Sequence, residues 1–310
     1  MTSQPASLRC IVNPASGQDE PVLAVLNRAF GDAVDWRVEL THADGDATRL
    51  ARQAVAEGVS VVAVYGGDGT VAEVATGLAG SDVPLAILPG GTGNAVAQEL
   101  GVPIDLAAAA ALALDPRARR VPVDAMRSGD RLFLLRFGIG AEARAIGGAS
   151  RERKDSLGWF AYLEGAIQEY RGAEPMRYRF HSEGATLELD AVSCAVANVG
   201  RIGRGGLRFS QHIEPDDGWL DLLVVRRWDV GMLGAAGLRL LGFDAEPRPF
   251  DDDPGDEALL HYRVRELRVE ADEPTPVHGD GDLLGETPFG VAIETGVLQV
   301  LVPIAAGVSG

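Results

Sequence analysis

Two glycine-rich segments, GGDGT at residues 66–70 and PGGTGN at residues 89–94, combine backbone and side-chain groups that can bind a phosphate. Glycine lets the backbone approach phosphate oxygens and adopt positive φ angles, which we expect at Gly67. Exposed N–H groups at the start of a following helix favour a negative charge. The hydroxyl groups of Thr70 and Thr92 add further donors. These segments therefore predict an anion site.

Asp68 is the acidic residue of the first segment. A carboxylate among phosphates would be repulsive unless a divalent cation lay between them. Charge alone therefore predicts that Asp68 is linked to Mg²⁺.

Both segments belong to a longer series in which an apolar run is followed by a polar loop and then by helical spacing. The four loops are NPASG (13–17), THADGDA (41–47), GGDGT (66–70) and PGGTGN (89–94). This alternation predicts a doubly wound α/β domain with a parallel sheet. Ligands bind beyond the carboxyl ends of such strands, all at one edge. Four loops in series therefore favour a phosphate site over plain turns.

The rhythm changes after about residue 125, where strand-like runs dominate and only 156–170 and 229–243 have helical spacing. The run HYRVRELRVEA (261–271) alternates like one strand with a solvated face. An antiparallel, sandwich-like second domain fits this pattern. We therefore predict domains over 1–124 and 125–310, with the last residues packing back on the first.

Composition excludes several classes of protein. The 310 residues carry a formal net charge of −17, which argues against nucleic acid as a partner. The chain has no apolar run long enough for a transmembrane segment and no basic signal region, which predicts a cytoplasmic protein. Lys154 is the one lysine and no P-loop motif occurs. Cys10 and Cys194 lie in strand-like runs and are expected to be free and buried.

A second acidic segment, GDGD (279–282), carries Asp280 and Asp282. Asp-Gly is a common signal for a tight hairpin turn, and from the residues alone a turn is the simpler interpretation. The alternative is a general base, since a carboxylate can take a proton from an acceptor hydroxyl.

Several motifs together resemble the diacylglycerol kinase catalytic domain of bacterial lipid kinases and sphingosine kinases, over nearly the whole chain. They are NPASG, GGDGTVAEVATGL, PGGTGN, SLGWFAYLEG, the segment from Asn198 to Leu222 with GRGGLRFSQHIEPDDGWLDL, and HGDGDLLGETP. The resemblance implies a nucleotide-binding first domain, a lipid-substrate second domain and an active site in the cleft between them. It implies transfer of the γ-phosphate of ATP, with Mg²⁺, to a diacylglycerol-like or sphingoid hydroxyl. The lipid would be presented at a membrane surface, with the protein cytoplasmic or peripheral there.

The resemblance also implies roles for single residues. The nucleotide contacts would be Asn13, Thr41, Gly66, Gly67, Asp68, Gly69, Thr70, Glu73 and Thr92. The base would be Asp280 or Asp282, and we favour Asp282 because it stands where the family has Glu. A structural metal would be held by Asp217 with the carbonyl groups of Glu214 and Trp219.

The chain departs from the family pattern at a few positions. Asp282 is one methylene shorter than the family's Glu, Ala72 replaces an Asn, and Gln211 and Ile213 replace a Pro-x-Ala pair. Two other functions remain open, an NAD kinase-type enzyme and a non-catalytic lipid- or nucleotide-binding protein. The sequence does not specify the acceptor lipid or the oligomeric state, for which a homodimer is one possibility. Trp159 and Tyr162 are candidates for a lipid pocket.

Overall fold

We describe the protein from a computed structural model. The described residues are 6–17, 21–141, 143, 174–201, 210–227, 246–252 and 254–304. The helices expected at 156–170 and 229–243, with Trp159 and Tyr162, lie outside them. The chain divides into two compact units, Met1–Ala125 with Thr295–Gly310, and Met126–Glu294.

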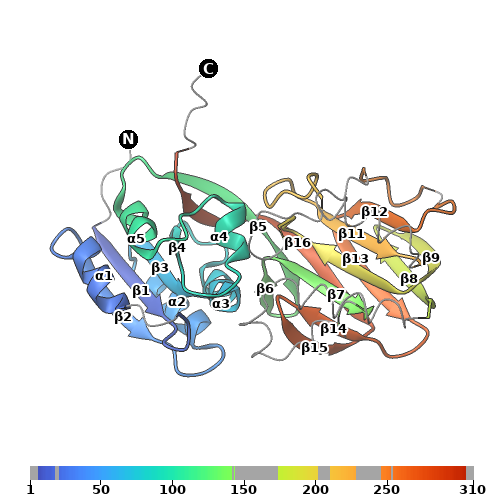
Figure 1. Cartoon of the computed structure of the whole chain (residues 1–310), viewed down its shortest axis with the longest axis horizontal. Helices are drawn as coiled ribbons and strands as arrows, with labels where there is room; N and C mark the ends of the chain where they lie inside the picture. Colours follow the sequence, from blue (N-terminus) through green and yellow to red (C-terminus); the bar gives the residue numbers. More distant parts are fainter. Residues whose placement is uncertain are drawn as a thin grey trace, which may run out of the picture. The chain divides into compact units, whose positions relative to one another are not determined.

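The first unit is built on a parallel sheet with strand order β2-β1-β3-β4, which the end of β16 joins beside β4 (Figure 1). The strands are β1 (Ser7–Val12), β2 (Asp35–Leu40), β3 (Val61–Gly66), β4 (Leu85–Pro89) and β16 (Phe289–Val302). Every residue of β3 is buried. A strand covered on both faces reads as a continuous apolar run, as VVAVYG does.

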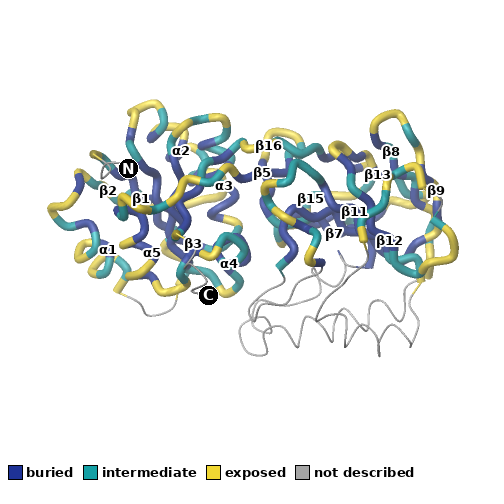
Figure 2. Tube along the Cα trace, turned by 90° about the horizontal axis from the view of Figure 1, so that it is seen from above, coloured by how far each residue is buried: buried dark blue, intermediate teal, exposed yellow. Residues whose placement is uncertain are grey.

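Helices cover both faces of this sheet. They are α1 (Val22–Phe30), α2 (Asp46–Ala56), α3 (Asp68–Leu78), α4 (Ala95–Glu99) and α5 (Leu106–Leu114). Helices α2 and α3 lie on one side of the buried strands, and α1 and α5 lie on the other (Figure 2). This arrangement confirms the predicted doubly wound α/β fold. Each strand–helix connection places its loop at the carboxyl edge of the sheet, where the predicted nucleotide contacts lie.

The second unit is mainly antiparallel and forms two sheets around one apolar core. One sheet has the order β12-β11-β10-β7-β14-β15, and the other contains β16-β13-β8-β9. The remaining strands are β5 (Arg119–Ser128), which begins in the first unit and ends in the second, and then β6 (Arg131–Phe133), β7 (Arg136–Gly140), β8 (Met176–Ser182), β9 (Ala185–Ala191), β10 (Ser193–Ala197), β11 (Leu220–Val225), β12 (Leu259–Val264), β13 (Glu266–Ala271), β14 (Pro276–Gly279) and β15 (Asp282–Glu286). The predicted sandwich is thus confirmed.

The prediction of one strand over 261–271 is wrong. The run contains most of β12 and all of β13, which belong to different sheets: β12 pairs with β11, whereas β13 pairs with β8 and β16. Only β13 shows the clean alternation, with Leu267 and Val269 buried and their neighbours more exposed. Strand β12 is largely buried. The sequence does carry a sign of the change of sheet, because the alternation of apolar and charged residues changes phase at the adjacent charged pair Arg265 and Glu266, between the two strands.

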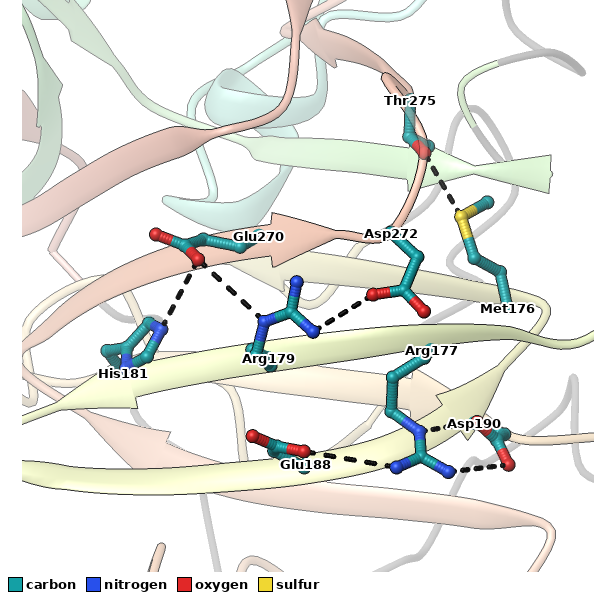
Figure 3. Close-up of polar contacts among 9 residues, drawn as sticks. All are labelled: Met176, Arg177, Arg179, His181, Glu188, Asp190, Glu270, Asp272 and Thr275. Atoms are coloured by element: carbon teal, nitrogen blue, oxygen red, sulfur yellow. Dashed lines mark hydrogen bonds and ion pairs between the residues drawn. The ribbon is translucent and has the colours of Figure 1, made fainter.

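The solvated face of β9-β8-β13 carries a cross-strand array of charges (Figure 3). Arg177 pairs with Asp190 across β8 and β9, at 2.7 Å from Nε to Oδ1. Arg179 pairs with Asp272 at 2.9 Å. Exposed pairs of this kind contribute only about 0–1 kcal/mol each, so their main effect is to keep this face solvated.

Both cysteines are free and buried, as expected. Burial raises the pKa of the Cys10 thiol to about 12, which leaves it unreactive at neutral pH. Among the described residues, no helix has the length and apolar character needed to cross a membrane.

Candidate active site

Three of the predicted loops meet at the carboxyl ends of β1, β3 and β4. The Asn13 side-chain amide donates to the Thr70 hydroxyl at 3.0 Å, which joins the first loop to the start of α3. The Gly90 N–H donates to the Gly66 carbonyl at 2.9 Å, which joins the PGGTGN loop to the end of β3. A Cβ at Gly66 would lie 2.6 Å from the Cβ of Thr70, so glycine is required for this approach.

The two glycine-rich segments touch at Gly67 and Gly91. A Cβ at Gly91 would lie 2.6 Å from the Cα of Gly67, so the backbones are in contact there. Asn94, at φ 51°, accepts from the Gly91 N–H at 2.9 Å and donates to the Gly91 carbonyl at 2.7 Å. Gly67 itself has φ −84° and ψ −179°, so our expectation of a positive φ there is wrong. A Cβ at Gly67 would lie 3.5 Å from the Gly91 Cα, an ordinary contact, so the close approach requires glycine at Gly91 and not at Gly67.

Gly69 is different, because the fold gives no reason for a glycine there. It is exposed in the first turn of α3, its φ is ordinary, and a Cβ would meet nothing within 4 Å. Glycine in a helix costs roughly 0.5–1 kcal/mol relative to alanine. A ligand that approaches this backbone from outside would explain the residue.

Asp68 faces the start of α4. Its Oδ1 accepts from the Val96 N–H at 3.1 Å. Loss of solvation raises the pKa of Asp68, and backbone N–H donors from Asn94 to Val96 oppose the shift. No arginine or histidine among the described residues forms an ion pair with Asp68. A poorly solvated carboxylate of this kind fits a bound cation.

The remaining predicted nucleotide contacts have distinct surroundings. Glu73 accepts with Oε2 from the N–H groups of Gly45 at 3.0 Å and Ala47 at 3.2 Å, so its carboxylate holds the start of α2. Thr41 is buried, and its N–H donates to the Val12 carbonyl at 3.0 Å. Thr92 is exposed. Thr92 thus has an accessible hydroxyl, whereas Glu73 shapes the loop before α2.

The GDGD segment forms the tight turn between β14 and β15. Asp280 has φ 49° and Gly281 has φ 102°, and Gly279 pairs with Asp282 across the two-residue turn. These angles are those of a type I′ turn, for which Asp-Gly is a favoured pair.

The Asp280 side chain is occupied by backbone donors. It accepts from the N–H groups of Leu134 at 2.8 Å and of Leu135 and Arg136 at 3.0 Å. Both carboxylate oxygens thereby hold the short connection between β6 and β7. The geometry assigns Asp280 a structural contact that the sequence did not indicate.

Asp282 is the accessible carboxylate of this turn. Its side chain is 66% exposed, and one oxygen lies 3.2 Å from a guanidinium nitrogen of Arg131. That guanidinium also lies over the Phe133 ring, 5.0 Å from its centroid. An exposed ion pair opens readily, so Asp282 can exchange its partner for a substrate hydroxyl.

The predicted metal residues, Glu214, Asp217 and Trp219, lie just before β11. The Asp217 Oδ1 accepts from the Trp219 N–H at 3.0 Å, and its Oδ2 lies 3.0 Å from the Arg263 guanidinium. Within the described part of the chain, no group of three or more His, Cys, Asp or Glu side chains could hold a metal ion. The difference from Asp68 is the guanidinium beside Asp217, since the described partners of Asp68 are backbone N–H groups.

One open groove of about 550 Å³ lies in the second unit, between the β8–β9 turn and the starts of β13 and β16. None of the predicted site residues lines it. Its lining is mixed in charge, with Arg127 and Arg268 beside Glu183 and Glu266. We assign no substrate to this groove.

Comparison with known proteins covers both units. Residues 7–126 match the diacylglycerol kinase catalytic domain family, and residues 135–239 match the family described as YegS C-terminal NAD kinase beta sandwich-like domain. A protein of Pseudomonas aeruginosa named "Probable lipid kinase YegS-like" is 33% identical over 269 residues, covering 86% of this chain and 84% of that protein. A protein of the same name from Alcanivorax borkumensis is 30% identical, covering 89% and 93%. The crystal structure of a diacylglycerol kinase from Bacillus anthracis matches with a TM-score of 0.72 and 26% identity, over 98% of this chain and 99% of that one.

Proposed function

Because this chain belongs to the family of YegS-like lipid kinases, we propose that it transfers the γ-phosphate of ATP to a lipid hydroxyl, diacylglycerol-like or sphingoid. The phosphate end of the nucleotide would lie against GGDGT and PGGTGN. Asn13, Thr70 and Thr92 would be its side-chain contacts, and Thr41 and Glu73 would shape the loop beside it.

The observation that carries this proposal is Gly69. The residue occupies a helical position that would favour alanine, faces open space and lies beside the backbone N–H groups that start α3. Close approach of an anion to this backbone supplies the missing reason for glycine. The contact between Gly67 and Gly91 fixes the neighbouring loop, so its backbone donors are already in position before ligand binds.

Mg²⁺ is the second component of the proposal, and Asp68 is the residue that would hold it, directly or through water. When bound there, Mg²⁺ would neutralise phosphate charge during transfer. Asp68 fits this role because it is a poorly solvated carboxylate whose described partners are backbone N–H groups.

Asp282 would be the general base. Its carboxylate would accept the proton of the lipid hydroxyl as the hydroxyl oxygen bonds to the γ-phosphorus and the bond to the β–γ bridging oxygen breaks, releasing ADP. The assignment rests on access, because Asp280 uses both of its oxygens for backbone donors whereas Asp282 has one exposed ion pair.

A labelled-ATP screen tests the proposal. The purified protein is incubated with Mg²⁺ and a panel of diacylglycerol, sphingosine, ceramide, undecaprenol and NAD. Label should enter a lipid, and Asp68→Asn should abolish it. Label in NAD alone would indicate an NAD kinase-type enzyme, and ATP binding with no labelled acceptor would favour a non-catalytic protein.

Asp190→Ala is the matched control for Asp282→Ala. Asp190 is also an exposed aspartate on a strand of the second unit and is also paired with an arginine (Figure 3). We expect full turnover from Asp190→Ala and a loss of about a hundredfold or more from Asp282→Ala, the usual scale for removal of a general base.

A further inference from the structure

The segment from Ser210 to Asp221 is held in place by one arginine of a neighbouring strand. Asp221 on β11 and Arg263 on β12 are directly opposite each other in the antiparallel register. Cross-strand neighbours bring their side chains within contact distance. The Arg263 Nε lies 3.3 Å from the Asp221 Oδ1.

The same guanidinium reaches two more oxygen atoms of the segment. Its Nη2 lies 3.0 Å from the Asp217 Oδ2 and donates to the His212 carbonyl. Arg263 therefore contacts two carboxylates and one backbone carbonyl, which is the set of oxygen donors that a hard metal ion would use. A planar guanidinium with several fixed donors can bridge such a set.

The two carboxylates that Arg263 contacts are buried or nearly buried. Asp221 and His261 are completely buried, with the His261 Nε2 2.6 Å from the Asp221 Oδ1. The Asp217 side chain is 18% exposed and that of Arg263 is 29% exposed. Two carboxylates in a poorly solvated place need a positive charge beside them, and Arg263 supplies it.

We propose that Arg263 is the permanent cation of this segment and takes the place of a bound metal at Asp217. The Asp217 Oδ1 accepts from the Trp219 N–H, the Asp217 Oδ2 lies 3.0 Å from the guanidinium as an ion pair, and a divalent ion beside Arg263 would meet a like charge. The segment is thus fixed without a metal. This inference does not depend on phosphoryl transfer, since it concerns only the structure of the second unit.

The test measures metal binding and unfolding rather than turnover. Calcium and magnesium are titrated into the wild-type protein and into Asp217→Asn by calorimetry, and thermal unfolding is followed with and without EDTA. We expect the two isotherms to agree and the unfolding temperature of the wild type to be insensitive to EDTA. A divalent site that Asp217→Asn removes, or an EDTA-dependent loss of stability that Asp217→Asn abolishes, would overturn the proposal.

Variants of Arg263 test its role directly. Arg263→Ala is expected to lower the unfolding temperature by several degrees, and Arg263→Lys by less, because lysine keeps the charge but cannot bridge both carboxylates. Arg177→Ala is the matched control, since it removes an exposed arginine–aspartate pair on β8 and should change little (Figure 3). If Arg263→Ala does not fold, Arg263→Lys still decides. Wild-type stability of Arg263→Ala would refute the proposal, and so would an Arg263→Lys protein that loses as much stability as Arg263→Ala, because lysine keeps the charge.

Discussion

The two aspartates of the GDGD turn should separate stability from catalysis. Asp280→Ala removes the acceptor for the N–H groups of Leu134, Leu135 and Arg136. Each hydrogen bond to a charged acceptor contributes roughly 1.5–3 kcal/mol, and water can reach part of this connection. We therefore expect a loss of about 3–6 kcal/mol in the free energy of unfolding, a large share of a typical stability.

Asp282→Ala should have the opposite profile. It removes one exposed ion pair with Arg131, which is worth about 0–1 kcal/mol. Its stability should therefore be close to that of the wild type, while its turnover falls at least about a hundredfold.

Three measurements distinguish the two aspartates: urea unfolding, amide hydrogen exchange over residues 131–140, and turnover per folded molecule. In Asp280→Ala the amides of Leu134 to Arg136 should exchange faster. Asp280→Asn is the milder control, because Asn tolerates the positive φ and its one oxygen can still accept. Wild-type stability and exchange in Asp280→Ala would refute the structural assignment, and normal turnover in Asp282→Ala would refute the catalytic one.

Four further substitutions have definite expected outcomes. Because the pKa of Asp68 is raised in the folded protein, its ionisation opposes folding at neutral pH, and this penalty disappears as the pH falls through the raised pKa toward the unfolded value near 3.8. In urea unfolding without ligand, Asp68→Asn should therefore be as stable as the wild type or more stable at pH 7, and the difference in stability should shrink toward pH 4. The variant should also be inactive. An Asp68→Asn protein that is less stable than the wild type at pH 7 without ligand would contradict this reasoning. Gly69→Ala should keep stability or raise it by up to about 1 kcal/mol, yet weaken binding of an ATP analogue in calorimetry. Gly77→Ala is its control, because the new Cβ would lie 2.5 Å from the Ala51 Cβ between α3 and α2. It should lower stability and leave the affinity of the folded protein for the analogue unchanged. Asp282→Glu should retain substantial kcat in steady-state assays because it keeps a carboxylate, and a loss as large as that of Asp282→Ala would count against a base at this position.

The α/β class and the sandwich could be predicted from the sequence because each element repeats a local pattern. The residues of β3 form an unbroken apolar run, and a helix period follows it in α3. Helix α1 was not predicted. The division of 261–271 between two sheets was also missed, because pairing partners are set by packing over long sequence distances.

The site was less predictable than the fold, since side-chain partners come from distant segments. Asn94 belongs to a quoted motif, yet its bonds with Gly91 depend on a positive φ that composition does not specify. Arg131 precedes Asp282 by about 150 positions, and only the pairing of strands brings them together. For Asn94, the presence of an Asn at the end of a glycine-rich loop is the one sequence signal that could have indicated its positive φ and its bonds with Gly91.

Asp68 and Asp217 show most directly what the sequence could not supply. Each lies in a glycine-containing segment, and each was linked to a metal, Asp68 by its charge and Asp217 by resemblance. The difference between them lies in the counter-charge. Arg263 reaches Asp217 from β12, 46 positions further along the chain, whereas the described partners of Asp68 are N–H dipoles at the start of α4. Dipoles only partly offset the loss of solvation, so the pKa of Asp68 stays raised, and the carboxylate would gain from the Mg²⁺ that we propose binds with the nucleotide. On our proposal Asp217 already has its cation in Arg263, and a divalent ion there would be repelled.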